Sequence, residues 1–160
     1  MKRLIFTFVV CCVFTDIASS QISITPLSQF QGDTLSYMKY NYSVETIEKF
    51  NGKTIGDILY ASDIKFNSVK FSYDKYRNIT GVNLYYNTIE RLENMPAKQS
   101  YYAVNVSLKE PIRPDKHETL YRRFYSDVKK YYPLTKENES LLAVLKIKSA
   151  GYAEMVIRRT

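Results

Sequence analysis

The sequence predicts a single α+β domain: N-terminal helices, an antiparallel sheet with one solvated face, one crossing amphipathic helix and a C-terminal hairpin. Three observations lead to this fold class. Hydrophobic residues make up 45% of the 160 residues and charged residues 24%, which is typical of a globular chain. Apolar residues recur at helical spacing over residues 35–59 and again over 116–132. Between these segments, apolar and polar residues alternate, as they do in strands that bury one face.

The first twenty residues have the order of a secretory signal peptide. Met1-Lys2-Arg3 is basic, Leu4 to Phe14 is an almost unbroken apolar run, and Ala18-Ser19-Ser20 are small residues. A bilayer span needs about 17–25 apolar residues, so the shorter run here favours cleavage after Ser20 over a permanent anchor. We therefore expect export to the periplasm or the extracellular space, with residues 21–160 as the folded domain.

Both cysteines, Cys11 and Cys12, lie in the export segment, so the expected mature domain has no disulfide. Small secreted eukaryotic domains usually contain disulfides, and their absence favours a bacterial exported protein. Four Asn-x-Ser/Thr sequons favour the alternative of eukaryotic secretion; they begin at Asn41, Asn78, Asn105 and Asn138. We interpret them as a by-product of a composition rich in Asn, Ser and Thr.

Two helices are expected at the start of the domain. Asp33 is a suitable N-cap, and apolar residues then recur as far as Phe50, where Asn51-Gly52 ends the helical pattern. Thr54 is expected to cap a second helix over residues 55–61. The apolar face of that helix consists of Ile55, Ile58 and Leu59.

The sheet is expected from three strands, over residues 64–74, 79–87 and 101–109. A change of phase at Asn67-Ser68 in the first strand predicts a bulge there. Residues 74–78 are expected to form a turn, and residues 88–99, which include Pro96, a loop. Because the alternation is one-sided on successive strands, we expect an antiparallel sheet with one face in solvent.

The C-terminal third is expected to contain a helix and then a hairpin. Asp115 and Glu118 have the spacing of a capping box, which opens a helix over residues 116–132. After a short helical turn capped by Thr135, residues 141–157 alternate around the small residues Ser149-Ala150-Gly151, so we expect a terminal hairpin. A helix that continues through Leu145 is the alternative.

The helix over residues 116–132 carries the first binding candidates. Its basic residues lie on the arc opposite its apolar residues, and they are Arg122, Arg123, Lys129 and Lys130. Residues 111–160 hold 11 basic and 6 acidic residues, which accounts for +5 of the formal +7 charge. The solvated face of a core helix is the simpler interpretation. The alternative is peripheral contact with an anionic surface, either membrane headgroups or acidic polysaccharide, and no motif indicates a specific nucleic acid.

Tyrosine supplies the second set of binding candidates. The chain has fifteen tyrosines and no tryptophan, and adjacent pairs place one ring on each face of a strand. The pattern places Tyr85 and Tyr101 outward, where they could stack on a sugar ring or anchor a protein partner. Core filling is the simpler alternative for these rings.

Catalytic signals are weak. His117 is the only histidine, so a metal site or a catalytic triad built around it lacks a marked partner. The carboxylate pairs Asp57 with Asp63 and Glu90 with Glu93 are the candidates for a small hydrolase. No glycine-rich phosphate loop is present, and we expect no catalytic residues, metal or cofactor.

Two short motifs carry a resemblance to known proteins. Asp33-Thr34-Leu35, followed by Phe50-Asn51-Gly52-Lys53-Thr54-Ile55-Gly56-Asp57-Ile58-Leu59, resembles a pattern in uncharacterised small exported proteins of Bacteroidota. Those proteins begin with a helix and then have a Phe-x-Gly-Lys-x-x-x-x-Leu-Leu-like element before a sheet, whereas Ile58 replaces the first leucine here. The resemblance implies export and the order of helix and sheet, and it implies no activity.

Together these observations favour a non-enzymatic exported binding or interaction module with a protein or polysaccharide partner. The alternatives are a peripheral binder of anionic surfaces and a small carboxylate-dependent hydrolase. The sequence does not indicate an oligomeric state.

Overall fold

The structure is a computed structural model that describes residues 22–96, 98–124 and 130–156. The expected signal peptide and Lys129 lie outside these residues. Within them, no helix has both the length and the apolar character needed to cross a membrane.

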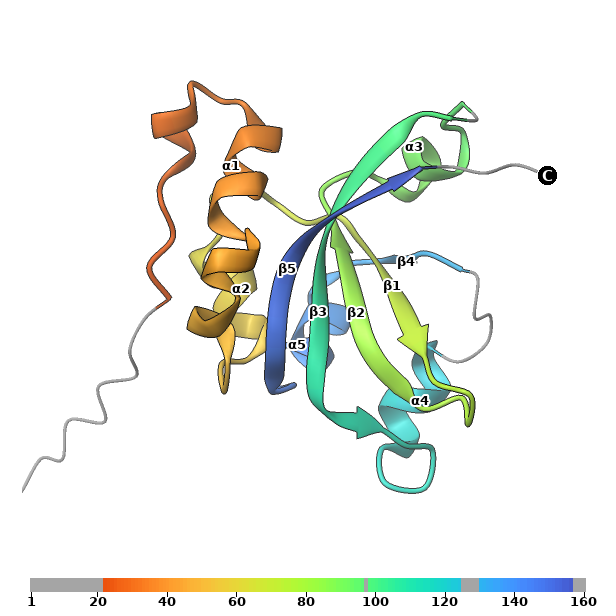
Figure 1. Ribbon diagram of the computed structural model, residues 1–160. Coiled ribbons are helices and arrows are strands. Elements are labelled where there is room, and N and C mark those ends of the chain that lie inside the picture. The colour runs from red at the N-terminus through yellow and green to blue at the C-terminus, as the bar shows by residue number, and fades with distance from the viewer. Residues whose placement is uncertain (1–21, 97, 125–129, 157–160) are drawn as a thin grey trace, which may run out of the picture.

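The fold is α+β, as predicted, with a five-stranded antiparallel sheet in the order β4-β1-β2-β3-β5 (Figure 1). The strands are β1 (Ser68–Tyr73), β2 (Ile79–Tyr85), β3 (Ser100–Ile112), β4 (Tyr132–Pro133) and β5 (Ile147–Val156). The helices are η1 (Leu27–Phe30), α1 (Thr34–Asn41), η2 (Val44–Phe50), α2 (Ile55–Ala61), α3 (Ile89–Glu93), α4 (Glu118–Phe124) and α5 (Lys136–Ala143), where η denotes a 3-10 helix.

The first expected helix is two helices. Asp33 caps α1 as predicted, and its carboxylate accepts the backbone N–H groups of Leu35 and Ser36. The α-helix ends at Asn41 because the next carbonyl, that of Tyr42, accepts the N–H of Tyr152 in β5 at 2.6 Å. The chain therefore turns after α1 and continues as η2.

The second helix has the predicted bounds and cap. The Thr54 hydroxyl accepts the N–H of Asp57 at 3.2 Å, and the Asp57 carboxylate accepts the N–H of Thr54 at 2.7 Å. This reciprocal capping box satisfies two backbone donors at the start of α2. Ile55 and Ile58 are then fully buried in the core.

One face of the sheet forms the main core. The inward residues follow the predicted alternation, with Val69, Phe71, Val82, Leu84, Val104, Val106 and Leu108 all buried. Helices α1, α2, α4 and α5 contribute buried residues to the same cluster, so they cover this one face. The expected bulge at Asn67-Ser68 is absent: β1 begins at Ser68, and the irregularity lies between Ser72 and Tyr73.

The opposite face is solvated only in part. Within the segment expected to be a loop, Thr88 caps the short helix α3, and this segment buries Leu92 and Met95 against the sheet. The prediction of one solvated face is therefore wrong at this end of the sheet, where Tyr85 lies in the small second cluster with these two residues. Away from it, Ser72, Asn83 and Asn105 form a hydrogen-bonded row across three strands.

The predicted crossing helix over residues 116–132 extends too far toward the C-terminus. The described helix α4 begins at Glu118, and Tyr132, expected at its end, lies instead in β4 opposite Val69. The buried Tyr132 hydroxyl donates to the carbonyl of Phe124 at 2.7 Å. Tyr132 therefore belongs to the main core, whereas Tyr131, just before β4, packs against the second cluster with Tyr85.

The prediction of a C-terminal hairpin is also wrong. Thr135 caps α5 as expected, but β5 is one continuous strand of 10 residues paired along β3. Gly151, expected in a turn, faces Asn105 across the sheet. Ile47 of η2 lies 3.8 Å from the position of a Cβ at residue 151, so η2 packs against this part of β5.

Candidate functional site

Tyr85 is a core residue and not a surface contact. It is 0% exposed, and its ring packs against Tyr101 at 5.8 Å and against Tyr131 at 5.4 Å between centroids. Burial raises the pKa of its hydroxyl, which donates to the sulfur of Met155 at 3.7 Å. The prediction of an outward Tyr85 is therefore corrected, because Tyr101, Tyr131 and the α3 segment cover it.

Tyr101 is half-buried beside that cluster. The Tyr131 hydroxyl donates to the Tyr101 hydroxyl at 3.4 Å, and the ammonium of Lys70 lies 5.0 Å from the centroid of the Tyr131 ring. Tyr101 thus keeps some exposed surface while its ring packs against that of Tyr85.

The basic candidates on α4 have acidic neighbours. Arg122 forms an ion pair with Glu118 one turn earlier. Arg123 forms an ion pair with Glu137 at 2.9 Å, and its Nε donates to Asn138 at 3.2 Å. Exposed pairs of this kind are weak, yet they lower the positive potential that an anionic surface would meet. Of the other two candidates, Lys130 is exposed and Lys129 lies outside the described residues.

The carboxylate candidates are not brought together as facing pairs. Asp57 belongs to the capping box at the start of α2, and Asp63, just after the end of α2, accepts the N–H of Leu27 at 2.7 Å. Glu90 and Glu93 are exposed on α3. The Nδ1 atom of His117 accepts the N–H of Arg113 at 3.4 Å. In the described ranges, no group of three or more His, Cys, Asp or Glu residues is placed to hold a metal ion.

Two of the sequons are not compatible with a glycan in this fold. Asn41 and Asn138 are buried, and the side-chain amide of each donates to backbone carbonyls. This supports the interpretation that the sequons follow from composition.

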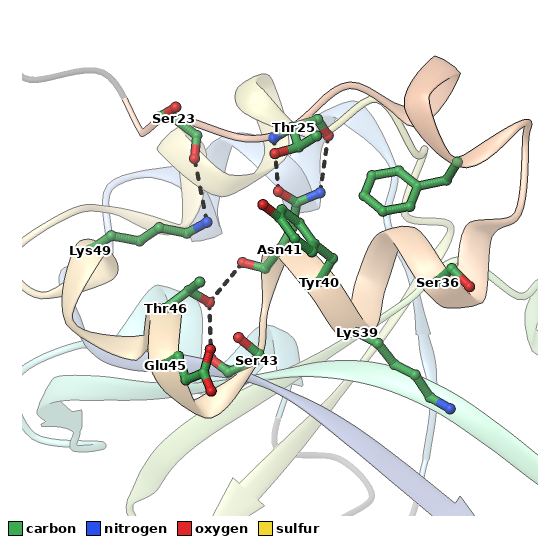
Figure 2. Close-up of a pocket in the computed structure, with 11 residues that line it drawn as sticks. Ser23, Thr25, Ser36, Lys39, Tyr40, Asn41, Ser43, Glu45, Thr46 and Lys49 are labelled. Carbon is green, nitrogen blue, oxygen red and sulfur yellow. Dashed lines mark hydrogen bonds between the residues drawn. The ribbon is translucent and has the colours of Figure 1, made fainter.

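A groove of about 680 Å³ lies between the lead-in segment (residues 22–26), α1 and η2 (Figure 2). Its volume is in the range of small-molecule sites, which span about 300–1,000 Å³. The lining residues are mostly hydroxyl-bearing, charged or aromatic, and they are Ser23, Thr25, Phe30, Ser36, Lys39, Tyr40, Asn41, Ser43, Glu45, Thr46 and Lys49.

Asn41 and Thr46 hold the walls of this groove together. The Asn41 amide accepts the N–H of Thr25 and donates to its carbonyl, which fixes the lead-in segment against α1. The Thr46 hydroxyl lies within hydrogen-bond distance of the carbonyls of Asn41 and Ser43, at 3.0 Å and 2.9 Å (Figure 2). These contacts join the end of α1 to η2 and hold the two walls of the concave surface together.

Lys49 is the least solvated charge in the groove. Burial lowers the pKa of its ammonium, which donates to the carbonyl of Ser23 at 3.3 Å and lies 5.1 Å from the Phe50 ring centroid. No carboxylate of the described residues forms an ion pair with it. The groove thus contains an ammonium whose hydration is reduced and whose charge is not neutralised.

The aromatic surface of the groove is Tyr40. Its side chain is among the few large hydrophobic groups that are exposed, at 60%. It packs on Phe30 at 5.5 Å, and Phe30 packs edge-on against the buried Tyr37 at 5.9 Å. The exposed ring is thereby held in place by the core.

No local sequence pattern indicates this groove. The sequence predicts one straight helix to Phe50 that contains both Tyr40 and Lys49. In the structure the helix is interrupted at Tyr42, and α1 and η2 together form a concave surface. The break depends on a hydrogen bond to β5, more than a hundred residues later, so a local pattern does not reveal it. Comparison with known proteins found no match to this chain among family models, curated proteins or solved structures.

Proposed function

We propose that this chain is an exported, non-enzymatic binding module whose ligand lies in the groove between α1 and η2. The observation that carries the proposal is the half-buried Lys49 ammonium, which faces a preformed groove together with the exposed ring of Tyr40. Ligand sites combine such apolar surface with a few polar groups that fix orientation.

The unused hydrogen-bonding capacity of the groove supports the same role. Among the described residues, the hydroxyls of Ser23, Thr25, Ser43 and Tyr40 have no hydrogen-bond partner. The carboxylates considered for catalysis lie outside the groove: Asp57 caps α2, Asp63 accepts the N–H of Leu27, and Glu90 and Glu93 are exposed on α3. A groove with many single polar groups favours recognition over acid–base chemistry, which needs two groups matched in position and pKa.

Fragment screening by NMR tests the location of the site. We expect small polar aromatic fragments to shift the backbone amides of Thr25, Tyr40 and Thr46, and the Tyr40→Ala variant to lose most of these shifts. Tyr60→Ala is the matched control, because Tyr60 is 80% exposed on α2 and does not line the groove. Fragments that bind elsewhere, or shifts unchanged in Tyr40→Ala, would contradict the proposal.

Export is tested by processing. When the full chain is produced in a bacterial host with an intact secretion pathway, we expect the exported protein to begin at Gln21. A chain that stays in the cytoplasm with Met1 intact would contradict the export part of the proposal and leave the groove unaffected.

A further inference from the structure

We infer that the groove takes a saccharide that carries a carboxylate, with the carboxylate bound at Lys49 and a sugar ring packed on Tyr40. This inference rests on the proposed binding function and adds the chemical class of the ligand.

The charge of the groove favours an anionic ligand. The groove is lined by two lysines, Lys39 and Lys49, and one acidic residue, Glu45, so its charge is positive. Lys39 runs away from the groove floor, and its ammonium lies 5.9 Å from the centroid of the Tyr152 ring (Figure 2). Lys49 is therefore the cation available inside the groove. A ligand carboxylate would give it a charge-assisted hydrogen bond, which is stronger than its present bond to the neutral carbonyl of Ser23.

The aromatic ring and the hydroxyl groups of the groove match the chemistry of a sugar. Tyr40 presents a supported aromatic face, and the C–H face of a sugar ring packs on such a surface. The free hydroxyls of Ser23, Thr25 and Ser43 can each donate and accept, as the hydroxyls of a sugar do. Glu45 adds an acceptor for sugar hydroxyls at the start of η2. A carboxylate and several hydroxyls on one ring describe a hexuronate.

The backbone of the lead-in segment favours a saccharide over an acidic peptide. Extended peptides gain affinity by pairing with a free backbone edge. In this groove the N–H and the carbonyl of Thr25 are both bonded to the Asn41 side chain, and the carbonyl of Ser23 accepts from Lys49. These three backbone groups of the lead-in segment are thus already engaged, which leaves little free edge there for an extended peptide.

Calorimetric titration with trigalacturonate, at physiological salt, tests the inference. We expect the wild-type protein to bind trigalacturonate and the Lys49→Gln variant to bind it about tenfold to a hundredfold more weakly, the usual cost of losing a hydrogen bond to a charged group. Gln keeps a donor near Ser23 while removing the charge. The fully methyl-esterified trisaccharide, which has the same rings without the charges, should bind the wild-type protein with a similarly reduced affinity.

Lys136→Gln is the matched control, because it removes one positive charge from the exposed start of α5 and leaves the groove intact. Circular dichroism and thermal melts establish that both variants are folded. The inference is overturned if wild type does not bind trigalacturonate, if the ester binds as tightly as the acid, or if the two lysine variants bind alike. Tighter binding of triglutamate than of trigalacturonate would also overturn it, in favour of an acidic peptide. If fragments locate to the groove while trigalacturonate fails to bind, the binding function stands and only the ligand class is wrong.

Discussion

The side-chain amide of Asn41 binds both backbone groups of Thr25. The N–H of Thr25 donates to Asn41 Oδ1 at 2.8 Å, and Asn41 Nδ2 donates to the Thr25 carbonyl at 3.0 Å. The same Nδ2 lies 3.2 Å from the carbonyl of Tyr37, and Asn41 is only 1% exposed. One buried amide therefore substitutes for a strand partner and makes the lead-in segment a wall of the groove.

Asn41→Ala should loosen that wall and destabilise the fold. The change leaves the two Thr25 backbone groups without their partner, which costs about 1–3 kcal/mol in the free energy of unfolding. Urea denaturation measures the loss, and hydrogen exchange should show weaker protection of the Thr25 amide. Asn94→Ala is the control, because Asn94 is exposed after α3, and we expect it to leave both measurements unchanged. Equal stability of the two variants would show that the amide does not hold the segment.

Gly81→Ala should destabilise the sheet. Gly81 lies in β2, and a Cβ atom there would lie 2.8 Å from the carbonyl oxygen of Val106 in the neighbouring strand β3. Because that oxygen belongs to the backbone, relief requires movement of a strand, and we expect a loss of about 1–3 kcal/mol by urea denaturation. Gly151→Ala in β5 is the matched control. Its nearest contacts would be 3.8 Å away, so its midpoint should stay near that of the wild type.

Alkaline pH should destabilise the protein through its buried tyrosines. Burial raises the pKa of Tyr42 and Tyr85 above the ordinary value of 10.0. Below pH 10 both residues are protonated in the folded and unfolded chains. As the pH rises past 10, the unfolded chain releases these protons and the folded chain does not, so the free energy of unfolding falls. Stability is therefore lost over the pH window from the tyrosine pKa of the unfolded chain up to the raised tyrosine pKa of the folded chain.

Absorbance at 295 nm and urea denaturation across this window check the prediction. In the folded protein, some of the tyrosine absorbance change should be delayed until the protein unfolds. Tyr42→Phe should reduce the slope of stability against pH, because one raised pKa is removed. A single titration step near 10 for every tyrosine in the folded protein would contradict it.

The N-cap residues in the sequence predicted correctly where three helices begin. Asp33, Thr54 and Thr135 were each expected to cap a helix, and each side chain accepts a backbone N–H in the structure. A cap depends on residues within one turn, so the sequence contains the whole interaction. The inward residues of β1, β2 and β3 were predicted for the same reason, because alternation along one strand defines its buried face.

The features that sequence reasoning missed depend on distant partners. Alternation around Gly151 is the same for a hairpin and for one long strand, and only the pairing with β3 distinguishes them. The groove exists because Tyr42 bonds to β5 and turns the chain between α1 and η2. Alternation predicts that Tyr85 faces solvent, because it identifies the two faces of a strand and does not say what covers the second one.

Tyr85→Ala should destabilise the protein far more than Tyr101→Ala. Tyr85 is fully buried among Tyr101, Tyr131, Leu92 and Met95, so truncation leaves a cavity that costs about 3–5 kcal/mol. Tyr101 is only half-buried, and its truncation should cost less. Urea denaturation of the two variants gives the comparison, with Tyr60→Ala on the exposed face of α2 as the control that should match the wild type.

Tyr85→Phe separates the ring from its hydroxyl. Among the described residues, the hydrogen-bond partner of the hydroxyl is the sulfur of Met155, a weak acceptor at 3.7 Å, so Phe should retain most of the stability that Ala loses. This ordering, with Phe near the wild type and Ala strongly destabilised, is what a core ring produces. A contact residue would give the reverse pattern: Tyr85→Ala would be as stable as the wild type and would lose only a binding partner, and that result would restore the outward placement that the alternation had predicted.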